Sequence, residues 1–381
     1  MHEGDLQMRC SNLPRRRAFT VVDLACALAV IVVLLAVVLP ALGRTAKSSM
    51  LATSFGNLMD LGAAHAIYAS EWNGRQVQFV VDDISTYGNG PQAFSSYNAA
   101  NTPDHPPVGL GWGTLQPSGS VTYFAYRVGN NVANAGLAVP IRFIGAGRYY
   151  GSFRLPNAEP FHYYVGGRFY DPTFYAPADR PVWDTVVANG CLDSPDQYAD
   201  CIPPIPSAGD IPAWSSYCFS PAAMFHPDVM RSPLDGGWQN PWSIDHGFES
   251  PAYAQARYPS LKTLMLEHNW VQNAPKDVCN PNFTLGVYNG CEPYSFNHSI
   301  DSAPATLFYD LSVRLLPNTE AKAADEQVQL QTSFGLWHRF TPFGFYGYLI
   351  YNGFDGTPVS HHVLTSDGIL GRDTIAGAGK P

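Results

Sequence analysis

The chain has 381 residues and a net charge of −9, and only 14% of its residues are charged, against ~25% in an average soluble domain. Hydrophobic residues make up 46% of the chain, which is too apolar for a disordered protein. The negative charge and the absence of a long basic run argue against a nucleic-acid-binding protein, which needs a basic patch.

An uncharged apolar run from Leu24 to Leu42 is the first predicted element. As a helix extended back to Phe19 it would be roughly 35 Å long at ~1.5 Å per residue, enough to cross a ~30 Å hydrocarbon core. Arginines cluster before the run, whereas only Arg44 and Lys47 follow it closely. This bias predicts a cytoplasmic amino terminus and an exported remainder. An acid inside the apolar boundary, at Asp23, is costly in a membrane and therefore points to a function.

The segment Arg15–Leu24, RRRAFTVVDL, resembles the cleavage and methylation signature of type IV prepilins and type II secretion pseudopilins. When Phe19 is counted as the first mature residue, the acid falls fifth, at Asp23, and a proline falls twenty-second, at Pro40, as in that family. Ala18 stands where the family has glycine, and aspartate replaces its glutamate. The resemblance implies cleavage between Ala18 and Phe19 by a prepilin peptidase. It also implies assembly with neighbouring subunits through the helix that carries Asp23 and Pro40.

Two other interpretations of this segment remain open. A plain signal anchor would hold an extracytoplasmic surface domain that binds carbohydrate or another ligand. A cleaved secretory signal could be cut after the small residues at Ala41–Gly43, although the apolar run is longer than the usual signal.

The helix is predicted to continue past Pro40, where the missing backbone donor should kink or melt it locally. Its apolar face would comprise Met50 or Leu51, Phe55, Leu58 or Met59, Gly62, Ala66 and Ala69, and Gly74 would end it. Polar residues, including His65, are predicted to fall off this face. The chain therefore divides into a basic leader (1–18), a transmembrane or filament-core helix (19–43), an amphipathic continuation (44–74) and an exported β-rich head (75–381).

The rest of the chain is rich in glycine and proline, with short β-prone segments between them. This pattern predicts an α+β fold in which the long helix packs on an antiparallel sheet with large loops. One short helix is expected at Ala321–Gln329. The expected strands are Val77–Val81, Val121–Val128, Ile141–Ile144, Phe161–Phe169, Leu261–Glu267, Ala305–Leu315, Phe343–Tyr351 and His362–Leu364.

Five of the seven cysteines lie in the predicted head. Two close pairs in loops rich in proline, aspartate and asparagine predict the disulfides Cys191–Cys201 and Cys279–Cys291 in an oxidising exterior. Free thiols are the alternative, and the sequence leaves the pairing of Cys218 open.

A second, patchier resemblance lies in the head. His298 precedes an apolar run that ends at Asp310 and Leu311, similar to a large pilin-like family whose last domain has a histidine, nine residues and then Asp-Gly. Here the gap is eleven residues, and Leu311 stands in place of glycine.

No nucleophile elbow, zinc-protease, P-loop or EF-hand motif occurs in the sequence, which favours a structural role, without a cofactor, over an enzyme. Calcium could bind the carboxylates of the Asp193–Asp200 loop, although solvated acids are the commoner case. The aromatic stretch from Tyr149 to Tyr170 predicts sheet core, with a sugar-stacking face as the alternative. The expected product is a single-pass inner-membrane subunit with an exported head. Its partners would be the membrane, the peptidase and neighbouring subunits, in a surface or periplasmic filament.

Overall fold

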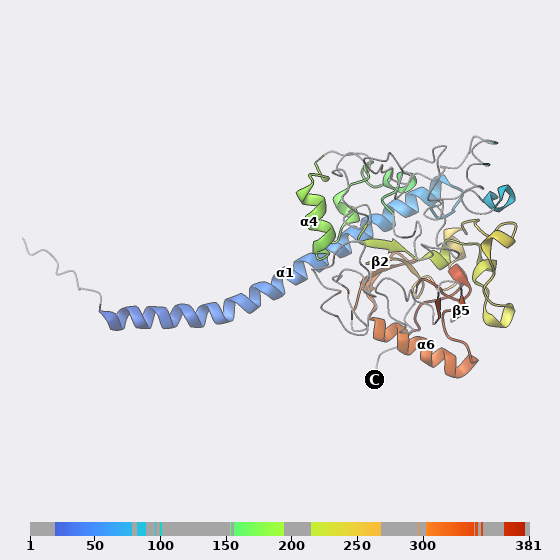
Figure 1. Ribbon diagram of the computed structural model, residues 1–381. Coiled ribbons are helices and arrows are strands. Elements are labelled where there is room, and N and C mark those ends of the chain that lie inside the picture. Colours follow the sequence, from blue (N-terminus) through green and yellow to red (C-terminus); the bar gives the residue numbers. More distant parts are fainter. Residues whose placement is uncertain are drawn as a thin grey trace, which may run out of the picture. The chain divides into compact units, whose positions relative to one another are not determined.

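Figure 1 presents a computed structural model of the chain. It describes residues 20–77, 82–88, 156–193, 215–267, 302–338 and 362–377, with positions 96, 100, 153, 297, 340–341 and 344–345. The predicted strands Val121–Val128 and Ile141–Ile144 lie outside the described residues, as do four of the five residues of Val77–Val81. Contacts along the chain divide it into two units, Met1–Ser49 and Met50–Pro381.

The dominant element is the helix α1, Val21–Glu71, which is 51 residues long and confirms the predicted amino-terminal helix. It remains helical through Pro40, so the local melting that the proline predicted does not occur. Proline removes a single backbone hydrogen bond, and the strongly helix-forming residues around it keep the flanking turns intact.

The carboxyl end of α1 closes as the sequence predicts, with one difference. The amide of Gly74 donates to the carbonyl oxygen of Ala69 at 2.7 Å, and Asn73 takes the left-handed conformation, with φ of +54°. This is the Schellman arrangement, in which the residue after the cap has positive φ and the next amide reaches back to the last turn. Asparagine tolerates that conformation, so Asn73 and Gly74 end the helix together.

The head contains a four-stranded antiparallel sheet, which makes the fold α+β. Its strands are β1 (Tyr217–Phe219), β2 (Thr263–Glu267), β3 (Ala305–Phe308) and β4 (Val313–Leu315), and they are adjacent in that order. Every residue of β1, β2 and β3 is buried. The strand predicted at Leu261–Glu267 is therefore confirmed as β2, whereas β1 was not predicted.

The segment predicted as one strand, Ala305–Leu315, forms a hairpin instead. Three residues lie between Phe308, the last residue of β3, and Ser312, which precedes β4, and the last of the three, Leu311, has φ of +65°. The amide of Phe308 donates to the carbonyl oxygen of Ser312 at 2.9 Å, and the carboxylate of Asp310 accepts from the Ser312 amide at 3.0 Å. A type I turn followed by a left-handed residue closes hairpins of this length. Because that residue is leucine rather than glycine, the sequence carries no obvious turn signal.

The strand predicted at Phe161–Phe169 is also absent. The segment forms the one-turn helix α3 (Glu159–His162), which Pro160 helps to begin, followed by turns. Gly166 and Gly167 have φ of +89° and +75°, a conformation that an extended strand does not contain. Phe161 and Phe169 are instead buried from a helix and a turn, whereas Tyr163 is exposed.

The remaining elements are short. Helix α4 spans Arg180–Ala188, and helix α6, Asn318–Thr332, confirms the helix predicted at Ala321–Gln329. Strands β5 (Phe340–Thr341) and β6 (Gly344–Phe345) pair with each other within and beside the predicted Phe343–Tyr351. His362–Leu364 lies in a turn rather than a strand. Single 3-10 turns, most of them opened by proline, occupy Ile84–Tyr87, Pro172–Phe174, Pro221–Ala223, Pro227–Met230, Pro233–Asp235, Pro241–Ser243, Tyr253–Gln255 and Gly368–Leu370.

The core of the head forms between the second half of α1 and the sheet. The buried residues of α1 recur at helical spacing and are Ser54, Leu58, Leu61, Gly62, Ala64, His65, Tyr68 and Ala69. The predicted face is thus confirmed at Leu58, Gly62 and Ala69 but wrong at His65, which is fully buried. The ring of His65 lies 5.5 to 6.1 Å from those of Phe161, Phe219 and Tyr253, so the neutral imidazole packs as an aromatic.

Candidate functional site

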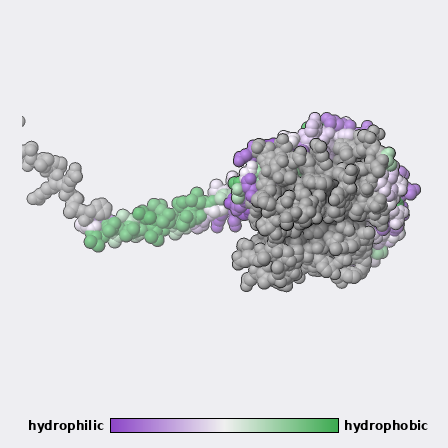
Figure 2. Space-filling model, turned by 45° about the horizontal axis from the view of Figure 1, so that its top comes forward, coloured by the Kyte–Doolittle hydropathy of each residue, from purple (hydrophilic) through white to green (hydrophobic). Residues whose placement is uncertain are grey.

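The amino-terminal half of α1 is the candidate assembly site, because it is apolar on every side. Its most apolar 18-residue window has a mean hydropathy of 3.1, and none of that window is buried. Figure 2 shows this half of the helix as an almost continuous hydrophobic surface. The helix is long and apolar enough to cross a membrane.

Asp23 lies in the first turn of this helix and closes its amino terminus. Its carboxylate accepts hydrogen bonds from the Thr20 amide at 3.0 Å and from the Thr20 hydroxyl at 2.7 Å. The Asp23 amide in turn donates to the Thr20 hydroxyl oxygen at 3.2 Å. These reciprocal bonds form a capping box, with aspartate in the place usually taken by glutamate. The cap is a local reason for an acid at this position, and the signal for it in the sequence is the Thr-x-x-Asp spacing ahead of the apolar run.

The other residues of the predicted processing and assembly site are distributed as follows. Pro40 lies within α1, in the exposed apolar half. Ala18 and Phe19, which flank the predicted cleavage point, lie outside the described residues, so cleavage stays a prediction.

The second half of α1 is bound to the sheet by a buried polar cluster. The Ser54 hydroxyl donates to Oε1 of Glu267 at 2.5 Å and lies 2.9 Å from the hydroxyl of Tyr217. Oε2 of Glu267 accepts from the side-chain amide of Asn297 at 3.0 Å and from the Ala305 amide at 2.9 Å. Burial raises the pKa of Glu267, and the hydrogen bonds from these three donors lower it in part. Among the buried residues of α1, Ser54 is the one that contacts the Glu267 carboxylate. The cluster therefore fixes how α1 is rotated about its axis on the sheet.

Close packing accompanies this polar contact. Gly62 faces the sheet, and a Cβ atom placed there would lie 3.1 and 3.2 Å from the methyl groups of Leu307 and 3.2 Å from a methyl group of Leu311. A larger residue would push the helix off the sheet. The glycine that the apolar pattern placed on the inner face thus lies at a close approach, where even an added methyl group would need the leucine side chains to shift.

A second buried carboxyl, Asp179, lies just before α4. The residue is 7% exposed. Its carboxyl group accepts a hydrogen bond from the Ser216 hydroxyl at 2.8 Å and another from the backbone amide of Val182. Burial is the largest cause of its altered pKa, which rises to about 7, and the negative charge of Glu267 adds to the rise. The side chain therefore caps α4 while holding its proton near neutral pH.

A buried ion pair ties the carboxyl-terminal segment to β2. The ammonium of Lys262 lies 3.0 Å from Oδ2 of Asp373 and donates to the hydroxyls of Ser220 and Thr365 at 2.8 and 2.7 Å. Neither charged side chain is exposed. The amide of Thr263 also donates to the same carboxylate at 2.8 Å. With every donor of the ammonium used, the arrangement serves structure rather than chemistry.

The predicted disulfides are described only at one end. Cys191 is buried and disulfide-bonded, and its partner lies outside the described residues. Its predicted pairing with Cys201, and that of Cys279 with Cys291, therefore stay predictions for non-reducing peptide mapping. Cys218 retains its thiol.

The buried thiol of Cys218 lies in β1. Its sulfur is 3.8 Å from the carbonyl oxygen of Leu266 and 3.8 Å from Nε2 of His362. Cys218 and His362 are 1% and 2% exposed, so a substrate or oxidant in solution does not reach the pair.

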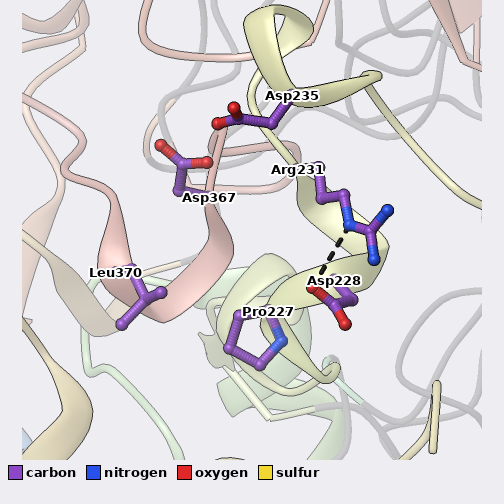
Figure 3. A pocket seen from close by; sticks show the side chains of 6 residues that line it. All are labelled: Pro227, Asp228, Arg231, Asp235, Asp367 and Leu370. Carbon is purple, nitrogen blue, oxygen red and sulfur yellow. Dashed lines mark hydrogen bonds and ion pairs between the residues drawn. The ribbon is translucent and has the colours of Figure 1, made fainter.

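An open pocket of about 330 Å³ lies on the head and is shown in Figure 3. Asp228, Asp235 and Asp367 line it, together with Arg231. Nε of Arg231 lies 3.2 Å from Asp228, and the carboxylate of Asp367 accepts the Ser232 amide at 2.8 Å. Two of the three acids are thus engaged with protein groups.

The loop Asp193–Asp200, considered above as a minor calcium-binding option, lies mostly outside the described residues. Asp193 is described, whereas Asp196 and Asp200 are not. Across the described ranges, no three histidine, cysteine, aspartate or glutamate side chains converge as metal ligands would.

Sequence reasoning found the apolar helix and its acid but missed the residues that seat the helix. Nothing in the sequence distinguishes Ser54, Asp179 and Glu267 from other polar residues. Ser54 and Glu267, which share a hydrogen bond, are more than 200 residues apart in the chain. No local pattern marks such a contact.

Comparison with known proteins adds no family to these observations. No family model, no curated protein and no solved structure matches the chain.

Proposed function

We propose that this protein is a pilin-like or pseudopilin-like subunit, which assembles through its amino-terminal helix into a filament of the type IV pilus or type II secretion kind. The observation that carries the proposal is the exposed apolar half of α1, which begins with a single acid. Such a surface needs either lipid or the same helix of neighbouring subunits to cover it.

Processing would create the charge that Asp23 needs. A lone carboxylate in a bilayer costs several kcal/mol unless a cation pairs with it or it takes a proton. Cleavage between Ala18 and Phe19 leaves a new α-ammonium group on Phe19. The amine of one subunit placed at Asp23 of the next would favour a staggered bundle over the isolated helix in lipid.

The capping box offers a purely local role for the same acid, and variants separate the two roles. Asp23→Asn keeps an acceptor for Thr20 but removes the charge. Thr20→Val breaks the cap but keeps the charge. Asp23→Ala removes both, and Asp23→Glu keeps both.

The experiment compares the sheared-filament fraction of each variant with its mature pool in the membrane. Assembly through the charge predicts that Asp23→Asn and Asp23→Ala are both inserted and trimmed but excluded from filaments, while Thr20→Val and Asp23→Glu are incorporated. If Asp23→Asn assembles as well as the wild type, the carboxylate acts only as a helix cap and the pairing role is refuted.

The membrane orientation belongs to the same proposal. The arginines before the helix would stay in the cytoplasm, and the head would lie outside, where a disulfide such as that of Cys191 persists. Prepilin peptidase and neighbouring subunits are the proposed partners. The large head favours a minor or specialised subunit, and its role would be assembly rather than catalysis.

A further inference from the structure

An unusually exposed aromatic group lies beside the carboxyl end of α1. The side chain of Tyr163 is 75% exposed, whereas the next most exposed aromatic side chains of the described residues, Tyr258 and Phe334, are 36% exposed. Tyr163 projects from the turn that follows α3. An exposed tyrosine is common on protein surfaces, and what distinguishes Tyr163 is the aromatic and acidic group of side chains around it.

The neighbours of Tyr163 form a rigid cluster, here called the Tyr163 cluster, made of Glu71, Trp72, Tyr163 and Tyr164. The rings of Tyr163 and Tyr164 meet edge to face, with centroids 5.4 Å apart and planes at 83°. The hydroxyl of Tyr164 donates to Oε2 of Glu71 at 2.7 Å and accepts from the indole Nε1 of Trp72 at 3.1 Å.

The cluster is anchored in the core through Tyr68, which is fully buried. Its ring lies 5.9 Å from that of Trp72 and 5.4 Å from that of Tyr164. The turn itself is held by the carbonyl oxygen of His162, which accepts from the amides of Val165 and Gly167 at 2.8 and 2.9 Å. The rings of Trp72 and Tyr164 are therefore held in place, and Tyr163 packs against one of them, so a ligand has few side chains to order.

We propose that the Tyr163 cluster binds a neutral carbohydrate by stacking a pyranose ring on the side chain of Tyr163. One face of a pyranose is made of C–H groups that pack on an aromatic ring, and its edge carries hydroxyls that need hydrogen-bond partners. Glu71 is exposed and uses only Oε2 for Tyr164, and a carboxylate has about four lone-pair sites. It can therefore accept sugar hydroxyls beside the ring.

This inference is independent of the assembly proposal, because Tyr163 and its neighbours belong to the unit Met50–Pro381 and lie outside the apolar half of α1. A head that binds glycans would serve equally on a filament and on a single anchored protein.

The test is native affinity electrophoresis of the full chain in detergent, in gels containing mannan, dextran, galactan or a soluble β-glucan. At least one polymer should retard the wild type. Tyr163→Ala should weaken the retardation by about tenfold, since it removes the stacked ring. Tyr163→Phe should retain most of it, and Glu71→Gln should weaken it without abolishing it.

Tyr258→Ala is the matched control, because it removes another exposed tyrosine outside the cluster and should leave the retardation unchanged. Tyr163 is exposed, so Tyr163→Ala should keep the thermal midpoint of the wild type, and a loss of binding would not reflect unfolding. The proposal is overturned if no polymer retards the wild type or if Tyr163→Ala and Tyr258→Ala behave alike. It is also overturned if choline, a cation that aromatic rings bind, displaces the polymer or binds in its place.

Discussion

Replacing Asp179 by asparagine should change how the stability of the head depends on pH. The carboxyl of Asp179 is buried, caps α4 and accepts the Ser216 hydroxyl, and burial raises its pKa from 3.8 to about 7. Asparagine is nearly as good a helix cap and has the same size, but it does not titrate. Asp179→Asn therefore removes the proton without removing the hydrogen-bonding group.

The expected magnitude follows from the pKa difference of about 3 units, at ~1.4 kcal/mol per unit, which gives about 4 kcal/mol. Because the pKa of Asp179 is higher in the folded protein, its contribution to stability is fully present below pH 3.8. It is lost as the pH rises through about 7. Buried His65 acts in the opposite sense. Its pKa falls from 6.5 to about 3, so its contribution is present above pH 6.5 and lost as the pH falls.

The two groups offset each other in the wild type, so the informative quantity is the difference between variant and wild type. Denaturation of the full chain, followed by tryptophan fluorescence from pH 4 to pH 8, should show the stability of Asp179→Asn rising relative to the wild type by about 4 kcal/mol. Asp184→Asn, on the exposed side of α4, should change by less than ~0.5 kcal/mol at every pH. Parallel curves for Asp179→Asn and the wild type would refute a carboxyl held neutral by burial.

Two further substitutions test the packing and the ion pair of the head. Gly62→Leu should destabilise the head by about 2 kcal/mol or more in thermal unfolding, because the added side chain would collide with Leu307 and Leu311. The control is Gly56→Leu, which has nothing within 4 Å of its Cβ position and should be neutral or stabilising. Lys262→Met should cost about 3–5 kcal/mol in denaturant unfolding by leaving a buried charge at Asp373, and adding Asp373→Asn should recover part of that loss. Equal midpoints for the two glycine variants, or no recovery in the double variant, would contradict these contacts.

The sequence predicted the elements whose pattern is local. The apolar run predicts α1, the aliphatic run before Glu267 predicts β2, and the alanine-rich segment Ala321–Gln329 predicts α6. Each of these patterns is formed by residues close together in the sequence. It can therefore be recognised without knowing which part of the fold the element packs against.

The failures have physical causes in tertiary contacts and in unmarked turns. The β3–β4 hairpin turns at Leu311, where the usual glycine is missing, so one strand was predicted instead of two. The aromatic run at Phe161–Phe169 resembles a strand because aromatic residues favour sheets, but positive φ at Gly166 and Gly167 turns the chain. His65 was predicted to face away from the core because it is polar, and it is buried because its imidazole is neutral among aromatic rings.

At the candidate site, the sequence identified Asp23 but not its partner. The hydrogen bonds between Asp23 and Thr20 depend on side-chain geometry in the first turn of α1. The resemblance to a processing signature explains the acid in another way and does not point to Thr20. The hydrogen bond between Ser54 and Glu267 joins segments far apart in the chain, and such a contact produces no periodic pattern in a single sequence.

The measurement that tests the central claim most directly is the mass of the amino-terminal peptide of the protein purified from a host with a prepilin peptidase. The account predicts a chain that begins at Phe19 and carries a methyl group on its α-amine. A chain that still begins at Met1, or one cut after Gly43, would contradict assembly through a processed pilin-like helix and would leave α1 as a plain anchor or an export signal.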